Sequence, residues 1–377
     1  MNISILNPAL SFIIPTHNRA ARLVTTLSRL VALPGPDAEI VVVDNGSSDD
    51  TVDAVHAVDS AITLITLPEN KGAVARNDGA RAAHGRILFM LDDDSCPAPG
   101  AVERALACLE DHRVGLAGCL VRLADGTYEE GGAPYVPIGC GMALRRETFE
   151  KLGGFCEIYE TYVEEYDLAF RALSDGYDVV YEEGAVVHHE PSRDGPTDFL
   201  VRQLARNNIY LAHKFFDEKD AERFSSWVLE RYGRFARRQG LTKGFDEAVV
   251  ALEEMRTKGL RDRFVLSDRA MAYAAPWNVA ARAIDALEAG NGRIAFLRAG
   301  KEIIYLIEAA RQRGMHVEAV YDEGLWSPGE EIAGVTVRSL DDVASFDGCL
   351  LCGGLTPGFK RNTQALAARL GKVLGDG

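Results

Sequence analysis

Short runs of apolar and β-branched residues alternate with longer amphipathic stretches from about residue 10 to residue 181. The strand candidates are SFIIP, EIVVVD, ITLIT, RILFML and GLAGCLV. Between them, helical spacing is found in RLVTTLSRLVAL, TVDAVHAV and AVARNDGARAAHG. This alternation is typical of an α/β domain whose sheet is largely parallel and covered by helices on both faces. Ligands of such sheets bind beyond the carboxyl ends of the strands, so residues that follow a strand are the first candidates for function.

The pattern changes twice farther along the chain. From about residue 197 to residue 290, helical periodicity dominates, and we expect this part to be all helix. From residue 293, strand candidates return in RIAFLRAG, HVEAVYDE and CLLCGG. We therefore expect three parts: an α/β domain over residues 1–215, a helical segment over residues 216–290, and a small α/β domain over residues 291–377.

Charge and hydropathy exclude several classes of protein. The formal net charge of −15 argues against nucleic acid as a partner, because binding to its backbone relies on clustered lysine and arginine. No apolar run approaches the ~20 residues of a membrane-spanning helix. The start, MNISILNPALSFIIP, lacks the features of a signal peptide, and the seven cysteines are an odd number and mostly scattered. We expect a cytoplasmic protein with reduced thiols.

Three consecutive carboxylates, Asp92, Asp93 and Asp94, close the apolar run RILFMLDDD. Two like charges about 4 Å apart repel by roughly 4 kcal/mol at an effective dielectric near 20, so such groups need a cation or a proton. On a strand, the first and third would project to one side, where Mg²⁺ or Mn²⁺ could be chelated. A solvated acidic loop is the alternative. Two cationic residues, Lys71 and Arg76, precede this triplet in the sequence.

Two earlier strand ends also carry polar residues. Pro15, Thr16 and Asn18 lie where the first strand passes into a helix, and such a turn presents free backbone N–H groups to a phosphate or a base edge. The second strand ends at Asp44, before the tight turn NGSS. A carboxylate at this edge can accept a hydrogen bond from the N–H of a pyrimidine.

A cluster of acidic residues begins the helix candidate EEYDLAFRAL. Thr161 and Glu164 have the spacing of a capping box, which would give Glu164 a structural role at the helix start. Glu165 has no such role. Asp167 lies near Glu164 on the helix surface, where it could orient a neighbour or face water. Each of the three carboxylates is a candidate general base.

The ordered segments together resemble glycosyltransferase family 2, the inverting enzymes with a GT-A fold. The resemblance covers roughly the first 215 residues and lies in SFIIPTHNR, EIVVVDNGSSDDT, NKGAVARNDGARAAHG, ILFMLDDD, GCGMALRRETFEKLGGF, VEEYDLAFRALSDGYDVVY and AVVHH. It implies that the turn after the first strand and Asp44 hold the nucleotide base. It also implies that Asp92, Asp93 and Asp94 are the DXD motif, whose last member binds Mg²⁺ or Mn²⁺ on the diphosphate of a nucleotide sugar.

The same resemblance suggests the catalytic base. The family usually has an ED pair at the start of a helix that follows a GGF turn, and its aspartate is the base. Here the pair is Glu164-Glu165, so Glu165 takes the base's position with one methylene more. Asp167 and Glu164 stay as alternatives.

Three further residues follow from the resemblance. Family members often have a histidine near the end of AVVHH that meets the metal or the diphosphate, and we prefer His189 to His188. Gly139 and Gly141 in GCGMALRR resemble the acceptor-side loop, where glycine permits close backbone approach.

The implied function is transfer of a sugar from a UDP- or dTDP-linked donor to a hydroxyl group. The acceptor would be a saccharide, a lipid-linked molecule or a protein, in the synthesis of bacterial surface polysaccharide or glycoconjugates. A non-catalytic nucleotide-sugar-binding or scaffold protein is the alternative. A nucleotidyltransferase would need a glycine-rich, arginine-containing loop after the first strand, which PTHNRAAR lacks.

The last part resembles small Rossmann-like modules found beside sugar-modifying enzymes. In LRAGKE, Arg298 stands where such modules have their first glycine, so we do not expect dinucleotide binding. Arg298 could contact a phosphate, or the module could be structural. The basic amphipathic stretch WVLERYGRFARRQG is compatible with peripheral contact to the inner face of the membrane or with a solvated helix face. A homo-oligomer is left open.

Overall fold

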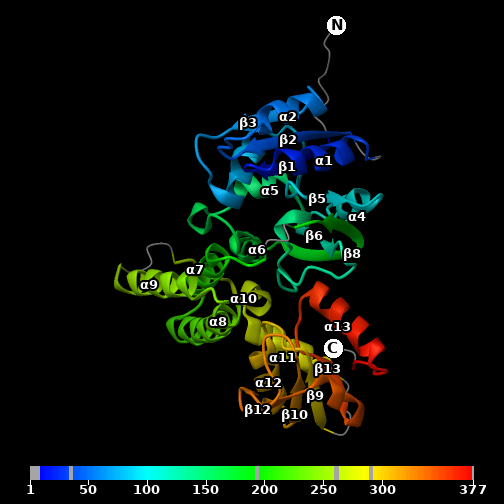
Figure 1. Cartoon of the computed structure of the whole chain (residues 1–377), viewed down its shortest axis with the longest axis vertical. Coiled ribbons are helices and arrows are strands. Elements are labelled where there is room, and N and C mark those ends of the chain that lie inside the picture. The colour runs from blue at the N-terminus through cyan, green and yellow to red at the C-terminus, as the bar shows by residue number, and fades with distance from the viewer. Residues whose placement is uncertain (1–8, 34–36, 192–194, 259–262, 288–291, 376–377) are drawn as a thin grey trace. The chain divides into compact units, whose positions relative to one another are not determined.

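The computed structural model describes residues 9–33, 37–191, 195–258, 263–287 and 292–375, which form two compact units (Figure 1). The first unit contains Met1–Gly126 and Tyr135–Leu266, and the second contains Thr127–Pro134 and Ser267–Gly377. The helical segment that we expected to be a separate part is thus divided between the units. The expected boundary at residues 290 and 291 lies outside the described residues.

The first unit is built on an eight-stranded sheet in the order β3-β2-β1-β4-β7-β6-β8-β5. Its strands are β1 (Leu10–Thr16), β2 (Ala38–Asp44), β3 (Thr63–Thr66), β4 (Ile87–Met90), β5 (Ser95–Pro97), β6 (Val114–Leu123), β7 (Met142–Arg145) and β8 (Asp178–His189). The four strands β3, β2, β1 and β4 pair in parallel, as predicted. The α/β fold class is confirmed.

The expectation of a largely parallel sheet is wrong for the other half of this sheet, which consists of β7, β6, β8 and β5. β7 runs antiparallel to both β4 and β6, and β5 runs antiparallel to β8, whereas β6 and β8 are parallel. The short strand β7 lies in the GCGMALRR segment that we interpreted as a loop. Its four residues are all buried between two neighbouring strands, and so short an apolar run gives no periodicity to detect.

Helices pack on this sheet through apolar faces. They are α1 (Ala20–Val31), α2 (Thr51–Val58), α3 (Arg76–Ala82), α4 (Ala101–Cys108), α5 (Arg146–Lys151) and α6 (Glu164–Ser174), with the 3₁₀ turns η1 (Gly72–Ala75), η2 (Gly139–Gly141) and η3 (Glu157–Tyr159). In α1, for example, Leu23, Leu27 and Leu30 recur on one face and join the core that contains Phe89 of β4.

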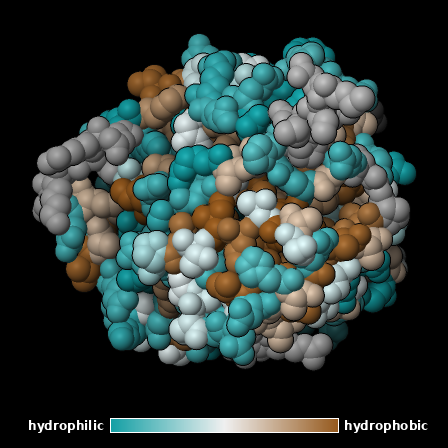
Figure 2. Space-filling model, turned by 90° about the horizontal axis from the view of Figure 1, so that it is seen from above, coloured by the Kyte–Doolittle hydropathy of each residue, from teal (hydrophilic) through white to brown (hydrophobic). Residues whose placement is uncertain are grey.

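Three long helices complete the first unit: α7 (Asp198–Phe215), α8 (Glu218–Gln239) and α9 (Thr242–Lys258). The sequence sets their ends. The hydroxyl of Thr197 accepts a hydrogen bond from the N–H of Leu200 at the start of α7, and Gly240, whose φ is 71°, caps the C-terminal end of α8. None of the described helices is both long enough and apolar enough to cross a bilayer. Hydrophilic and hydrophobic residues are interspersed over the face seen in Figure 2.

The second unit has a five-stranded sheet in the order β11-β12-β10-β9-β13. Its elements are α10 (Asp268–Ala274), α11 (Pro276–Asp285), β9 (Arg293–Leu297), α12 (Ile303–Gln312), β10 (His316–Tyr321), β11 (Glu331–Ile332), β12 (Val335–Arg338), η4 (Leu340–Ser345), β13 (Cys349–Cys352) and α13 (Pro357–Arg369). All of its strands except β11 pair in parallel, as in the predicted small α/β domain.

Arg298 follows β9 in this unit and has a left-handed backbone, with φ of 62°. Its guanidinium donates to both carboxylate oxygens of Glu130, over 2.7 and 3.1 Å. Glu130 belongs to the segment 127–134, and Asn362 of α13 holds the same segment through Tyr128, with the two residues exchanging hydrogen bonds of 2.9 and 2.8 Å. In this structure, a carboxylate of the chain itself is the partner of Arg298.

Candidate functional site

The candidate site lies where β1, β2 and β4 end together. Thr16 at the end of β1 is in register with Asp44 at the end of β2. Met90, the last residue of β4, is in register with Ile13 of β1, so the acidic triplet continues beside Thr16. Parallel pairing thus brings together polar residues that are far apart in the sequence, at the edge where α/β sheets bind ligands.

Asp44 is buried at the end of β2, with 1% of its surface exposed. Its Oδ1 accepts a hydrogen bond of 3.0 Å from the N–H of Ser47. Its Oδ2 has no hydrogen-bond donor among the described residues. A buried carboxylate oxygen without a donor is unfavourable, and a donor supplied by a ligand would relieve this cost.

The turns after β1 and β2 are tied to each other and to the next segment. Asn18 has φ of 53°, and its N–H donates to Oγ of Ser47 over 2.9 Å. Asn45 accepts from the N–H of Lys71 over 2.9 Å. The Lys71 ammonium lies 3.3 Å from Asp78 of α3, so its partner here is not in the acidic triplet.

The acidic triplet forms a turn, because β4 ends at Met90 and the N–H of Ser95 donates back to the carbonyl of Asp92 over 3.1 Å. The strand geometry that we expected for the triplet is therefore wrong. The contacts instead separate Asp92 from the other two carboxylates: Arg19 donates to both Asp93 and Asp94, over 2.6 Å each.

Arg19 was not singled out from the sequence, although it follows directly on the turn PTHN. Its two carboxylate partners are more than 70 residues away, so no local pattern indicates the contact. Thr16 adds a hydrogen bond of 2.8 Å from its hydroxyl to Asp93. The first strand and its turn therefore fix two members of the triplet.

Two carboxyl groups of the triplet, those of Asp93 and Asp94, are held in different electrostatic states. Burial raises the pKa of Asp93 to about 6, although the charge of Arg19 opposes this. Burial acts in the same direction on Asp94, but a hydrogen bond to His189 and the charges of His189 and Arg19 lower the pKa of Asp94 below its ordinary value. The ionised form of these carboxyl groups is thus stabilised by neighbouring positive charge, as it is in a cluster that binds a cation.

Arg76, at the start of α3, connects the triplet to the start of α6. Its buried guanidinium donates to the carboxylate of Asp92 and, over 3.2 Å, to the carbonyl of Leu91. Nη1 lies 3.7 Å from Oε1 of Glu164. A Cβ at Gly139 would lie 3.8 Å from this guanidinium, which is an ordinary van der Waals contact, so η2 packs beside Arg76.

The helix α6 begins with Glu164 almost fully buried and Glu165 half-buried. Burial raises the pKa of Glu164 well above its ordinary value, the charge of Glu165 raises it further, and Arg76 opposes both. The predicted capping box is wrong. The residue that caps α6 is Val163, and it makes no side-chain hydrogen bond to the helix. Thr161 lies before this cap, because the chain turns sharply between the two.

Asp167 lies one turn into α6 and is completely buried. It accepts hydrogen bonds from Arg171 over 2.6 Å and from the hydroxyl of Tyr159 over 3.2 Å, and it pairs with Lys214 of α7. These contacts favour a structural role for Asp167, linking α6 to α7. The half-buried Glu165 is the carboxylate of this helix start that is more open to a substrate.

The segment before α6 is strained. Glu160, Tyr162 and Val163 all have positive φ, at 58°, 64° and 76°, a conformation that is costly for residues other than glycine. Asn207 of α7 is fully buried beside it. Its Nδ2 lies 2.8–2.9 Å from the carbonyl oxygens of Tyr159, Thr161 and Tyr162. This amide was missed in the sequence, because it lies in an ordinary helical pattern.

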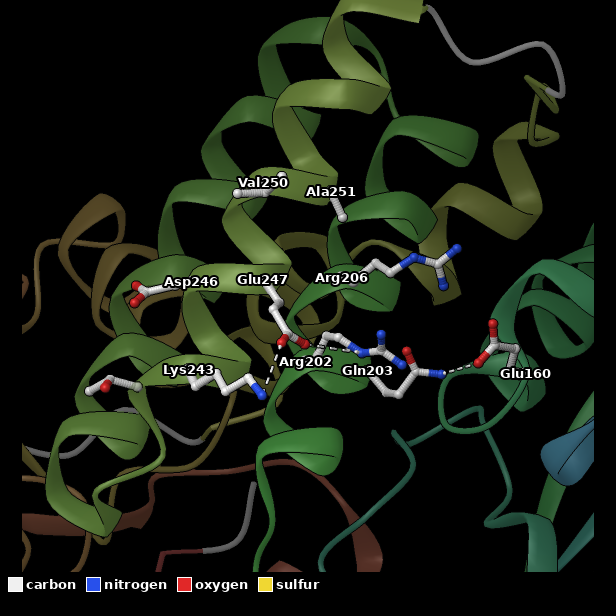
Figure 3. Close-up of a pocket in the computed structure, with 10 residues that line it drawn as sticks. Glu160, Arg202, Gln203, Arg206, Lys243, Asp246, Glu247, Val250 and Ala251 are labelled. Carbon is white, nitrogen blue, oxygen red and sulfur yellow. Dashed lines mark hydrogen bonds and ion pairs between the residues drawn. The ribbon is translucent and has the colours of Figure 1, made fainter. Parts of the chain in front are cut away.

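A cleft of ≈ 630 Å³ opens next to this segment, between α7 and α9 (Figure 3). Gln203 of α7 donates to the carboxylate of Glu160 over 3.0 Å, and the cations of Arg202 and Lys243 each lie 3.9 Å from Glu247. The remaining lining residues are Arg206, Thr242, Asp246, Val250 and Ala251. Among the charged residues of this cleft, Arg202 and Lys243 face Glu247.

The end of β8 and the turn η2 complete the site. His189 points to the triplet, with Nε2 3.2 Å from Oδ1 of Asp94 and 3.9 Å from Oδ2 of Asp92, whereas His188 is exposed. Between Gly139 and Gly141, Cys140 is buried. Ligand atoms of Asp92, Cys140 and His189 all lie within 4.8 Å of one another. The sequence did not indicate Cys140.

Comparisons with known proteins show what this chain is similar to. Residues 11–160 match the family model described as glycosyl transferase family 2. An uncharacterized glycosyltransferase of Haemophilus influenzae is 27% identical over 191 residues, which cover 44% of this chain and 62% of that protein. Succinoglycan biosynthesis protein ExoO of Rhizobium meliloti is 36% identical over 101 residues, covering 26% of this chain and 29% of that protein.

A validoxylamine A glucosyltransferase of Streptomyces hygroscopicus is 40% identical over 106 residues, which cover 26% of this chain and 25% of that protein. The chain thus matches less than two thirds of the length of each of these relatives. Among solved structures, the mannosyltransferase PcManGT from Pyrobaculum calidifontis, in complex with GDP-Man and Mn²⁺, has a TM-score of 0.47 at 24% identity. The alignment covers 68% of this chain and 77% of that one.

Proposed function

We propose that this chain, whose residues 11–160 match the family model described as glycosyl transferase family 2, is a metal-dependent, inverting enzyme that transfers a sugar from a nucleotide-sugar donor to a hydroxyl group. The observation that carries the proposal is the acidic triplet at the ends of β1 and β4. Its charges are balanced by Arg19, Arg76 and His189 at the edge where the donor would bind.

The residues present fit a divalent cation. The side chain of Asp92 is 37% exposed, so it is open to an incoming ion, and His189 faces both Asp92 and Asp94. Mg²⁺ and Mn²⁺ prefer carboxylate oxygens and take the remaining ligands from phosphates. In this proposal, Asp94, Asp92 and His189 would hold the ion, and the ion would supply positive charge for the departing diphosphate.

The other donor contacts come from the ends of β1 and β2. The turn beside the nucleotide base is formed by Pro15, Thr16 and Asn18. Asp44 accepts a hydrogen bond from the nucleotide base through its unsatisfied Oδ2. Asp93 keeps Arg19 and Thr16 in place. Lys71 and Arg76 supply positive charge for the diphosphate.

Inverting transfer needs one base on the acceptor side, and we assign it to Glu165. Its carboxylate takes the proton from the acceptor hydroxyl as oxygen attacks the sugar carbon and the nucleoside diphosphate leaves. The neighbouring Glu164 is buried, and its carboxylate lies 3.7 Å from the guanidinium of Arg76. We also place Gly139 and Gly141 on the acceptor side, where Gly139 is half-buried and Gly141 is buried.

The test replaces Glu165 by Gln, which keeps the size and removes the base. Transfer should fall by roughly 10²–10⁴-fold, the usual contribution of a general base. Binding of the nucleotide with Mn²⁺, measured by calorimetry, should be the same in this variant as in the unaltered chain. Asp175→Asn, an exposed carboxyl at the other end of α6, is the control. Unchanged turnover in Glu165→Gln would remove the assignment. Metal-dependent donor binding without any transfer by the unaltered chain would favour the alternative of a non-catalytic nucleotide-sugar-binding protein.

Donor and acceptor are part of the proposal. We expect a UDP- or dTDP-linked donor and an acceptor in polysaccharide or glycoconjugate synthesis. The names of relatives such as the succinoglycan biosynthesis protein support polysaccharide synthesis. Nucleotide sugars can be compared by thermal shift with and without Mn²⁺. A ligand at 100 times its dissociation constant adds about 2.7 kcal/mol of stability, so the donor should give the largest shift. Removal of the metal with a chelator should abolish that shift.

A further inference from the structure

We propose that Cys140 completes a thiolate-containing metal site with Asp92 and His189, and that this site takes Zn²⁺ in competition with the Mg²⁺ or Mn²⁺ ion of sugar transfer. The inference rests on the proposed function in one respect, since both ions share Asp92 and His189. The role of Cys140 as a ligand, and the preference of its thiol for Zn²⁺, do not depend on the proposed function.

The sheet holds the three ligands in fixed positions. Asp92 follows β4, Cys140 lies in η2, which directly precedes β7, and His189 ends β8. β4 and β7 are paired, with Met90 opposite Met142, and β6 pairs with both β7 and β8. Three segments that are separate in the sequence therefore converge through continuous strand pairing, not through a flexible loop.

The side-chain atoms are arranged to share one ion. The carboxylate oxygen, the Cys140 sulfur and an imidazole nitrogen lie within 4.8 Å of one another. Arg76 engages Oδ1 of Asp92, whereas Oδ2 lies 3.9 Å from Nε2 of His189. Small side-chain rotations would bring three ligand atoms onto one cation, and Asp92 is exposed enough to admit it.

The chemistry of this ligand set favours zinc. Thiolate is a soft ligand and imidazole suits Zn²⁺, which takes three protein ligands and leaves a fourth position open. Mg²⁺ and Mn²⁺ prefer oxygen, so Cys140 adds little to their affinity. On zinc binding, the Cys140 thiol loses its proton to solvent and the sulfur–metal bond forms. Zinc then occupies Asp92 and His189, and we expect it to inhibit transfer by competition.

Cobalt provides the test, because Co²⁺ enters zinc sites and absorbs in the near ultraviolet when a thiolate binds it. The full chain, titrated with Co²⁺, should develop this band. Cys140→Ser should lack it and should bind Zn²⁺ at least tenfold more weakly in calorimetry, with Mn²⁺ affinity within twofold of the unaltered chain. Cys108→Ser, which removes a half-buried thiol on α4, should behave like the unaltered chain.

Zinc-edge X-ray absorption on the unaltered chain is the second measurement and needs no variant. It should show one sulfur neighbour at about 2.3 Å. Cobalt binding without the band, a band that persists in Cys140→Ser, or a zinc shell without sulfur would overturn the inference and leave the proposed function standing. A cobalt band in the unaltered chain, together with unaltered turnover of Glu165→Gln, would support the zinc site and remove the assignment of Glu165 as the base.

Discussion

At the scale of single residues, Glu164 shows what burial does to a carboxyl group at the start of a helix. It is 4% exposed, and burial together with Glu165 raises its pKa well above the ordinary value of 4.5. A raised pKa means that the folded chain binds the proton more tightly than the unfolded chain does. The free energy of unfolding should therefore fall as pH rises from about 4.5 through the raised pKa of Glu164.

This argument predicts the effect of Glu164→Gln. The variant has no proton to lose at this position, so its melting temperature should depend less on pH above 4.5 than that of the unaltered chain. Glu147→Gln, an exposed carboxyl in the first turn of α5, is the matched control. Melting curves recorded across the acidic to neutral range check the prediction. Parallel profiles for the Glu164 variant and the unaltered chain would contradict it.

Asp167 gives a second prediction at this scale. Asp167→Asn leaves the ammonium of Lys214 buried without its counter-charge, and breaking a buried pair from one side costs about 3–5 kcal/mol. Asp175→Asn breaks the exposed pair with Lys151 and should cost less than about 1 kcal/mol. Urea denaturation measures both. Equal losses would mean that Asp167 does not hold α6 to α7.

At the scale of elements, α7 holds the strained segment that leads into α6. Asn207→Ala removes the amide that meets three backbone carbonyls, so we expect a loss of about 1–3 kcal/mol in the free energy of unfolding. Transfer should fall as well, because the residues before Glu164 and Glu165 lose their support.

The control for this prediction lies next to it on the helix. Asn208 donates to the carbonyl of Leu204 in its own helix, and Asn208→Ala should change neither stability nor transfer by much. Denaturation and turnover should be measured on both variants. If Asn207→Ala matches Asn208→Ala in both, the amide does not position the start of α6.

The elements themselves were largely predictable. The run EIVVVD became β2, and TVDAVHAV became α2, because periodicity and β-branched residues are local signals. β7 and the cap of α6 were not predicted. β7 exists because β4 and β6 lie on either side of it, and Val163 caps α6 because Asn207 holds the preceding carbonyls.

At the scale of the whole molecule, the second unit contains a short piece of chain, 127–134, whose flanking residues belong to the first unit. Glu130 pairs with Arg298 through two hydrogen bonds and also accepts one of 2.9 Å from Asn362. The position that would be a glycine in a dinucleotide-binding turn is therefore used to hold the chain's own segment.

A double-mutant cycle tests this role. Glu130→Gln, Arg298→Gln and the double variant should show a coupling of about 1 kcal/mol, since both side chains are only partly buried. Hydrogen exchange of residues 127–134 should become faster in each variant. Arg293→Gln, which breaks the pairs of Arg293 with Asp347 and Glu318 elsewhere in the second unit, should leave that exchange unchanged. Exchange that stays slow in Glu130→Gln would show that other contacts hold the segment.

The sequence by itself determined most of the helices and the longer strands and which carboxylates follow the strands, because these depend on residue type and on periodicity within a few neighbours. It did not determine how those carboxylates are balanced. Arg19 meets Asp93, and Cys140 meets Asp92 and His189, only because parallel pairing and the return of β7 bring distant segments to one edge of the sheet. Contacts between such distant segments leave no periodic trace in the sequence, so only the tertiary structure decided them.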